Sequence, residues 1–471
     1  MKTDIKKYIF VIFCSLLTSG AIAQSFRSAY FLEGVTGRHR LNPAFMGERN
    51  YISLPALGFF GTGIQGNVGL TDFIYPYDDP SGKYELTTFM SSTVKGDEFL
   101  NKLHDMNRIR MNLDYTILGT GFYGMGGFNT IELSLRSDMN SNIPYALFDF
   151  MKTGMDQAEG STYQIRDMRI FSEAHGELAF GHAHAINERL TIGAKLKILL
   201  AGAYADAHVN QLDVTMSGDK WQVVAQGTVE GSLGGASFET EDDGKGDHIE
   251  GVEVDNPGMN GWGLATDLGF SYQLNHDLLL SGALTDLGFI SWRNVIAGKT
   301  LNEPYEFDGF EDINTDDDDP DQSDNFDEQL EQLGDDLADL AKFYDQGAIA
   351  GKRKIIAATL NLAAEYKMPF YRKLTAGFLW TTRFNALHTF TEGRLSANLT
   401  PSKWFDFSVS YGVSNLAQSL GWIVNFHPAG FNFFIGSDHT VLNVNSQGIP
   451  LNDLNAGIFM GMNINFGKRR Y

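Results

Sequence analysis

The sequence predicts an all-β fold, a transmembrane antiparallel β-barrel of about 14 or about 16 strands. Three observations predict it: an N-terminal export signal, successive segments with one apolar and one small or polar face, and a C-terminal segment that alternates in the same way. Lipid-facing and lumen-facing residues cancel in any average, so the negative mean hydropathy is compatible with a membrane barrel.

Residues 1–23 have the features of a secretory signal peptide. Three lysines precede an apolar run at residues 8–17, and Ala21-Ile22-Ala23 forms a small-x-small cleavage site. The run is shorter than the roughly 20 apolar residues that a spanning helix needs. We therefore expect cleavage after Ala23, a mature chain that starts at Gln24, and membrane spans made of strands.

Cysteine content and charge exclude several classes of function. The only cysteine, Cys14, lies within the signal, so the mature chain has no thiol for metal binding, catalysis or lipid attachment. An acidic insert at residues 300–347 holds 18 Asp and Glu against one Lys, and it accounts for most of the net charge of −22. Nucleic acid is not an expected partner, because phosphates are bound by Lys and Arg.

The segment at residues 24–45 is not a strand, because its apolar residues do not alternate. It contains Arg38, His39 and Arg40, and it ends in Asn42-Pro43-Ala44. Taken alone, this tripeptide indicates a turn, since Asn before Pro favours turn initiation. The segment also resembles the N-terminal hatch of FadL-type porins for hydrophobic compounds. That resemblance implies a plug at residues 24–45 inside a barrel at residues 46–471, with Arg38, Arg40, Asn42, Pro43 and Ala44 as transport residues.

A second resemblance rests on two motifs that flank the acidic insert. Residues 284–292 read Leu-Thr-Asp-Leu-Gly-Phe-Ile-Ser-Trp, and residues 433–438 read Phe-Phe-Ile-Gly-Ser-Asp. Together they resemble an uncharacterised family of Bacteroidetes-type outer-membrane barrels, distantly similar to FadL and to PorV of the type IX secretion system. The resemblance implies a location in a Gram-negative outer membrane, and it implies a fold more strongly than an activity.

The alternation itself predicts which side chains face the lumen. Segments that begin at Ile131, Leu190, Trp262 and Leu374 each place apolar residues on one face, and residues 455–466 repeat the pattern as the closing strand. A soluble sandwich would carry charge on that outer face. Charges on the inner face predict a lumen that is wet, at least locally. The expected lumen-facing charged residues are Glu132, Arg136, Lys195, Lys197, Asp267, Lys373 and Arg383.

Loop lengths predict the topology. Short connections near residues 187, 275, 402 and 428 fall on one end of the barrel, and the long connections fall on the other. The strand count depends on residues 207–229, which either span the membrane or form an outer hairpin. Two connections contain helical patterns, at residues 144–155 and 326–343, and each is expected to cover the barrel mouth.

Two candidate metal sites are weak. Oxygen ligands alternate as in a calcium loop at Asp312, Asn314, Asp316 and Asp318, but Asp317 occupies the position where the turn requires Gly. A solvated acidic loop is the expected interpretation. His182, His184 and His175 lie on one strand, with the first two on one face, and the sequence identifies no third ligand for that pair.

No sequence pattern supports an enzyme or a bound cofactor. The chain lacks a Gly-x-Ser-x-Gly nucleophile elbow and a phosphate-binding glycine loop. We therefore expect a monomeric channel for passive uptake of hydrophobic or amphipathic small molecules, in contact with lipopolysaccharide. The alternative is a scaffold that does not transport, such as a PorV-like anchor for surface proteins in a secretion system.

Overall fold

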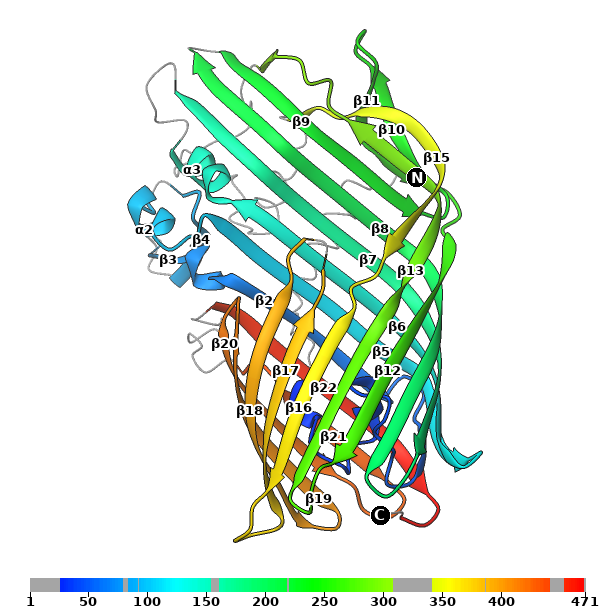
Figure 1. Cartoon of the computed structure of the whole chain (residues 1–471). Helices are drawn as coiled ribbons and strands as arrows, with labels where there is room; N and C mark the ends of the chain where they lie inside the picture. Colours follow the sequence, from blue (N-terminus) through cyan, green and yellow to red (C-terminus); the bar gives the residue numbers. More distant parts are fainter. Residues whose placement is uncertain are drawn as a thin grey trace.

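The computed structural model is an antiparallel barrel whose strands follow one another in chain order (Figure 1). It describes residues 26–78, 84–91, 93–153, 161–217, 220–307, 341–385, 387–440 and 453–469. The expected signal peptide and most of the acidic insert, including Asp312, Asn314, Asp316 and Asp318, lie outside these residues.

Fourteen strands form the closed wall. They are β2 (Phe59–Gly69) with its short extension β1 (Asn50–Ser53), β5 (Met106–Gly124), β6 (Gly127–Pro144), β7 (Thr162–Ala185), β8 (Leu190–Ser217), β12 (Gly261–Gln273), β13 (Leu278–Lys299), β16 (Thr359–Lys367) with its extension β15 (Tyr344–Ile355), β17 (Leu374–Arg383), β18 (Phe390–Ser402), β19 (Phe405–Ser414), β20 (Gln418–Phe426), β21 (Asn432–Ser437) and β22 (Asp453–Phe466). The predicted barrel of about 14 strands is confirmed.

The last strand closes the ring. β22 pairs with β21 on one side and with β1 and β2 on the other, in registers that include Asn50↔Phe466 and Phe60↔Met460. Phe459 is buried, whereas Met460, Ile464 and Phe466 are exposed on the outer side. Closure leaves no unpaired sheet edge at this junction, which is why a barrel wall can stand in lipid.

One part of the wall is much longer than the rest. β7 and β8 have 24 and 28 residues, whereas β17 and β20 have 10 and 9. Beyond the start of β12, β9 (Lys220–Leu233) takes its place between β8 and β13. Residues 207–229 are therefore the outer part of a hairpin that continues the wall, and the count is 14 and not 16.

Smaller elements gather at the long-loop end. They are β3 (Ile74–Asp78), β4 (Tyr84–Thr88), β10 (Ala236–Asp242), β11 (Asp247–Val254), β14 (Tyr305–Phe307), α2 (Gly96–Leu100), α3 (Tyr145–Thr153) and the 3₁₀ turn η3 (Leu70–Asp72). α3 confirms the helix predicted at residues 144–155, and its Leu147 and Phe150 belong to one apolar cluster with Leu212 and Val214 of β8. The helix predicted at residues 326–343 lies largely outside the described part of the chain. None of the helices described is long and apolar enough to cross a membrane.

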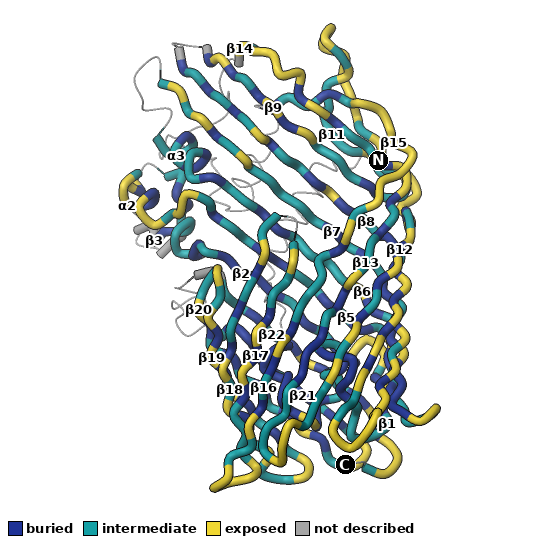
Figure 2. Tube along the Cα trace, viewed as in Figure 1, coloured by how far each residue is buried: buried dark blue, intermediate teal, exposed yellow. Residues whose placement is uncertain are grey.

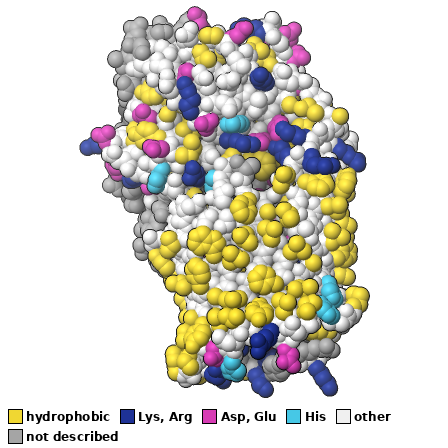
Figure 3. All heavy atoms as spheres, in the orientation of Figure 1, with side chains coloured by type: hydrophobic (Ala, Val, Ile, Leu, Met, Phe, Trp, Pro, Cys, Tyr) yellow, Lys and Arg dark blue, Asp and Glu magenta, His cyan; other side chains and the backbone are white. Residues whose placement is uncertain are grey.

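Exposed apolar side chains form a belt around the shorter part of the barrel. They include Leu118, Leu135, Leu196, Leu268, Leu395 and Ile464, each on a different strand. Figure 2 shows exposed positions at the short turns below and the outer hairpins above, and Figure 3 shows the belt in yellow over the lower half, with charged side chains above it. Such a belt is the surface that barrels of this class present to lipid.

Candidate functional site: the hatch and its contacts with the wall

Residues 26–45, here called the hatch, lie inside the barrel in its lower half (Figure 1). They form two 3₁₀ turns, η1 (Arg27–Ala29) and η2 (Thr36–Arg40), and no strand. Ala29, Tyr30 and Leu32 have no exposed surface. An irregular segment can be buried in this way only if its polar groups find partners on the wall.

The Asn-Pro-Ala turn sits in a notch of the wall. Asn42 is fully buried, and its amide nitrogen donates to the carbonyl oxygens of Phe270 at 3.0 Å and Gly282 at 3.3 Å. Its side-chain oxygen accepts from the Ala44 backbone N–H at 2.9 Å. The notch requires glycine, because a Cβ at Gly193 would lie 2.2 Å from the Pro43 carbonyl group. The turn predicted from Asn-Pro is therefore also a docking element.

His39 connects the hatch to two strands. Lys195 Nζ on β8 donates to His39 Nδ1 at 2.8 Å and lies 3.2 Å from Glu132 on β6. On the other side, His39 Nε2 is 2.7 Å from the hydroxyl oxygen of Tyr51. Burial and the Lys195 ammonium group lower the pKa of His39 to about 3, so the ring is neutral at physiological pH. A neutral imidazole has one nitrogen that accepts and one that carries a proton. Because Nδ1 accepts from Lys195, the proton is on Nε2, and Nε2–H donates to the Tyr51 hydroxyl oxygen.

Arg40 enters a cluster of buried charges beside His39. It forms a short ion pair with Asp114 on β5, and its guanidinium lies 4.5 Å from the ring centroid of Phe59. Asp114 is also 3.5 Å from Arg136 on β6. Further wall pairs extend the cluster: Arg136–Asp286 at 2.8 Å, Arg136–Glu177 at 3.4 Å, Lys197–Asp267 at 2.9 Å and Lys197–Asp286 at 2.5 Å.

A carboxylate binds the start of the hatch. The two side-chain oxygens of Asp438, which follows β21, accept from the backbone N–H groups of Arg27 and Ser28, each at 2.7 Å. The Arg27 guanidinium lies 3.2 Å from Glu392 on β18, and Glu392 is also paired with Arg394 at 2.8 Å. Charge-assisted bonds of this kind fix both the position and the direction of the segment.

Apolar contacts complete the docking. Phe26 packs edge-on against Phe59 and Phe459, with ring centroids 5.1 and 5.2 Å apart. Tyr30 and Phe31 pack with Leu379 on β17. The hatch is thus held by aromatic packing and by ion pairs, and the two kinds of contact meet at Phe59.

The short-turn end has its own anchor. Asn432 donates to the Gly34 carbonyl oxygen at 3.3 Å, and His427 lies 2.9 Å from Asp406 and 3.5 Å from Glu48. Burial alone would lower the pKa of His427, but hydrogen bonds to Asp406 and Glu48 and their charges raise it to about 9. The contacts of protonated His427 with Asp406 and Glu48 therefore stabilise the folded chain. Their contribution to the unfolding free energy is fully present below the ordinary histidine pKa and is lost as the pH rises through 9.

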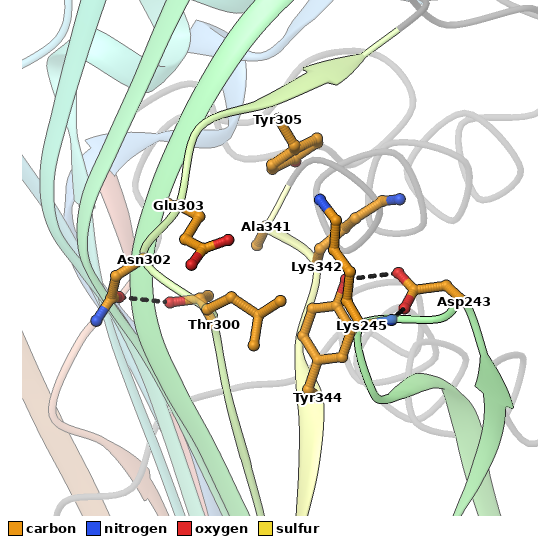
Figure 4. A pocket seen from close by; sticks show the side chains of 11 residues that line it. Asp243, Lys245, Thr300, Asn302, Glu303, Tyr305, Ala341, Lys342 and Tyr344 are labelled. Atoms are coloured by element: carbon orange, nitrogen blue, oxygen red, sulfur yellow. Dashed lines mark hydrogen bonds between the residues drawn. The ribbon is translucent and has the colours of Figure 1, made fainter.

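A cavity of about 120 Å³ remains in the lumen beside the hatch. It is lined by Phe26, Arg27, Arg40, Phe59, Arg110, Asp114, Arg136, Asp138, Asp286, Arg383 and Phe390, together with two leucines and smaller polar residues. A second cavity, of about 40 Å³, lies among the outer hairpins near Tyr344 and Asp243, whose side chains share a 2.6 Å hydrogen bond (Figure 4). The second cavity is remote from the hatch and has room for only a few water molecules.

The expected lumen residues have different positions. Glu132, Arg136, Lys195, Lys197 and Asp267 are within the wall cluster, and Arg383 is paired with Asp138 at 2.7 Å. The expectation for Lys373 is wrong: it precedes β17 in an exposed turn and donates to the Pro401 carbonyl oxygen. Side chains alternate between the two faces only within a strand. Arg383 is the last residue of β17 and follows the alternation, whereas Lys373 lies one residue before the strand begins. The five other charges are mostly buried against each other, and Arg136 among them also lines the cavity beside the hatch.

Two other sequence candidates, Arg38 and the pair His182 and His184, make none of the contacts between hatch and wall described above. The Arg38 guanidinium carbon lies 4.2 Å from the ring centroid of Phe45, so this contact joins two residues of the hatch. His182 and His184 stack on each other with ring centroids 6.0 Å apart, on the outer face of β7, and His182 is 2.9 Å from the Asn129 amide oxygen. No cluster that could hold a metal ion occurs in the part of the chain that the structure describes.

Several residues of the site escape sequence reasoning. Asp438 and Asp286 occur in the two motifs at residues 433–438 and 284–292, but nothing in the motifs shows that they meet the hatch and its cluster. Arg27 and Asp438 are 411 positions apart. Asp114 could have been found from alternation, since it is a single acid between the apolar residues Leu113 and Tyr115.

Fold and site together define a β-barrel with an N-terminal segment plugged into its lumen. The chain belongs to a family of unknown function, DUF5723, which it matches over residues 43–438. This confirms the expectation of an uncharacterised family. No curated protein matches the chain.

Several solved barrels are similar in architecture. The toluene transporter TbuX of Ralstonia pickettii aligns at a TM-score of 0.40 with 10% identity, over 94% of this chain and 100% of its own. A FadL homologue of Pseudomonas aeruginosa aligns at 0.42 with 11% identity, over 95% and 100%. The translocator domain of the autotransporter NalP of Neisseria meningitidis aligns at 0.33 with 7% identity, over 89% of each chain. At such scores the likeness says nothing about what this barrel carries.

Replacing Asn42 should loosen the hatch. Asn42→Ala removes both hydrogen bonds to the wall carbonyls, at a cost of about 1–3 kcal/mol, so trypsin should cut after Arg38 or Arg40 faster in the purified protein. Asn415→Ala, at an exposed turn position, is the matched control and should leave the rate unchanged. Equal cleavage of wild type and Asn42→Ala would show that this turn does not hold the hatch.

The pKa of His39 predicts an acid sensitivity. A histidine with a pKa of about 3 in the folded chain binds its proton only after unfolding, so it weakens folding as the pH falls below about 6.5. Between pH 7.5 and pH 5, wild type should lose about 2 kcal/mol more unfolding free energy than His39→Gln. Urea unfolding followed by tryptophan fluorescence measures this difference. Because His427 titrates in both proteins, its opposite effect cancels, and parallel pH profiles would contradict a neutral buried His39.

Proposed function

We propose that this protein is an outer-membrane channel for passive uptake of amphipathic small molecules, with the hatch as its gate. The observation that carries the proposal is the way the hatch is held. Hydrogen bonds and ion pairs dock it to the wall, and a cavity lies beside it within the closed barrel. Polar contacts can be exchanged for contacts with water or solute, so such a plug can shift without unfolding the wall.

The cavity lining favours amphipathic over purely apolar solutes. Three phenylalanines face the same space as five arginines and three aspartates. A wholly apolar molecule would exclude water from Arg110, whose buried Nε has no hydrogen-bond partner among the described residues, and that is costly. The expected export signal, the apolar belt and the closed sheet support placement in an outer membrane, with the short turns facing the periplasm and the long wall facing outward. Contact of the belt and its charged rim with lipopolysaccharide is part of this proposal.

One observation favours a second candidate, a scaffold that holds other proteins at the cell surface. β8 is 28 residues long, although a membrane-spanning strand needs only about 10. The excess length, with β9 and the β10–β11 hairpin, makes a platform above the belt that passage of a small molecule does not require. A scaffold of this kind would have no need for a mobile hatch.

A reversible tether separates the two functions. Ser28 Oγ and Ser410 Oγ are 2.8 Å apart, so Ser28→Cys with Ser410→Cys should form a disulfide between the hatch and β19. The mature chain is expected to contain no other cysteine. The oxidised variant should lose uptake of an amphipathic fluorescent dye by intact cells, and a reducing agent should restore it.

The matched control tethers two wall strands. Thr162 and Thr215 join β7 to β8 with their hydroxyl oxygens 2.9 Å apart, so Thr162→Cys with Thr215→Cys should leave uptake unchanged when oxidised. If the oxidised Ser28–Ser410 tether leaves dye uptake unchanged, the hatch is not the gate, and the scaffold function is favoured.

A further inference from the structure

The cavity beside the hatch contains more positive than negative charge. Five arginines and three aspartates line it. The three aspartates are already engaged: Asp114 with Arg40 and Arg136, Asp286 with Arg136 and Lys197, and Asp138 with Arg383. Arg27 is paired outside the lining, with Glu392 and Asp438.

Arg110 is the arginine of the lining whose ion pair is the longest. Its nearest carboxylate oxygen is that of Asp138, at 3.7 Å, which is beyond hydrogen-bond distance. Its Nε atom is buried without a hydrogen-bond partner among the described residues, and so is the Asp138 Oδ1 atom. The side chain of Arg110 is 9% exposed. A buried guanidinium with unused donors is costly unless something in the cavity accepts from them.

The neighbours of Arg110 add positive charge. Arg108 lies two residues away on the same face of β5, and Arg383 lies across the cavity and shares Asp138 with Arg110. His388 is close enough that burial and the charges of Arg108 and Arg110 lower its pKa to about 4. Neither ring nitrogen of His388 has a partner among the residues described. In the cavity lining itself, Arg110, Arg383 and Arg27 each keep a buried Nε–H without a hydrogen-bond partner among the described residues, and Arg110 and Arg383 share the Asp138 carboxylate.

We propose that Arg110, flanked by Arg383 and Arg27, binds an oxyanion in this cavity: a carboxylate, sulfate or phosphate group. Planar guanidinium groups match the oxygen geometry of such groups and bind them through paired hydrogen bonds. The cavity, of about 120 Å³, has room for one such group and a short apolar substituent. Phe390, whose ring centroid lies 5.5 Å from the Arg110 guanidinium and 4.9 Å from that of Arg27, gives the group's apolar substituent a surface to lie on.

The inference deepens the proposed function, on which its biological meaning rests, by naming the chemistry of the solute's polar end. The oxyanion is either a free inorganic ion or the head group of an amphiphile. Both sources present the same oxygens to Arg110. They differ in whether an attached chain adds affinity through Phe26, Phe59 and Phe390.

The test is binding to the purified full-length barrel in a non-ionic detergent, measured by calorimetry. The probes are sulfate, hexyl sulfate and hexanol. We expect saturable binding of hexyl sulfate and no binding of hexanol. If the natural occupant is an amphiphile, sulfate should bind with lower affinity than hexyl sulfate. If the occupant is a free ion, the two affinities should be equal. Hexanol binding as tightly as hexyl sulfate, or no saturable binding of either anion up to about 10 mM, would overturn the inference.

Variants locate the site. Arg110→Gln should weaken hexyl sulfate by at least about tenfold, whereas Arg166→Gln, which removes a half-exposed arginine of β7 paired with Asp213, should not change it. Asp138→Asn removes the competing carboxylate and should strengthen binding severalfold, which provides a gain of affinity that misfolding cannot imitate. Unchanged affinity in both Arg110→Gln and Asp138→Asn would refute the site. None of these measurements involves uptake, so a failed gate and a failed anion site are distinguishable.

Discussion

The structure depends on buried charges of the wall, which pair with one another and also with the hatch. Lys195, Glu132 and Asp114 point into the lumen from three strands, and each is less than 10% exposed. An isolated buried charge costs several kcal/mol, and removing one partner from a buried pair is strongly destabilising. His39 and Arg40 of the hatch supply partners to these wall groups. The wall therefore specifies the hatch position electrostatically, and the hatch cannot leave without solvent replacing it.

The same constraint explains the shape of the hatch. A regular helix would satisfy most of its own backbone groups, a regular strand would need a partner strand, and either would present side chains in only a few directions. The short turns of residues 26–45 instead expose backbone N–H and C=O groups, which Asp438 and Asn432 bind. The Asn42 turn lies against Gly193 and Gly269, where any side chain would occupy its place. Sequence and packing thus cooperate to hold an irregular segment in one conformation.

Much of the fold follows from periodicity, and much of the site does not. Alternation around Ile131 and Leu190 was sufficient to place Glu132, Lys195 and Lys197 inside, because one face must meet lipid. The same rule failed for Lys373, which lies beyond the end of its strand. The choice between 14 and 16 strands depended on where β12 begins, since β9 can extend the wall only above that point. Pairings such as Arg27 with Asp438 depend on the closure of the whole ring, and no local pattern encodes them.

The central claim is that the hatch is an integral part of the folded barrel in its resting state, held at its first residues by Asp438. Residue-resolved hydrogen exchange of the purified protein tests it most directly. The backbone amides of Arg27 and Ser28, which donate to Asp438, should exchange as slowly as amides in the middle of β8. Exchange as fast as that of the exposed turn at residues 274–277 would contradict the account, because it would show that the hatch is not docked.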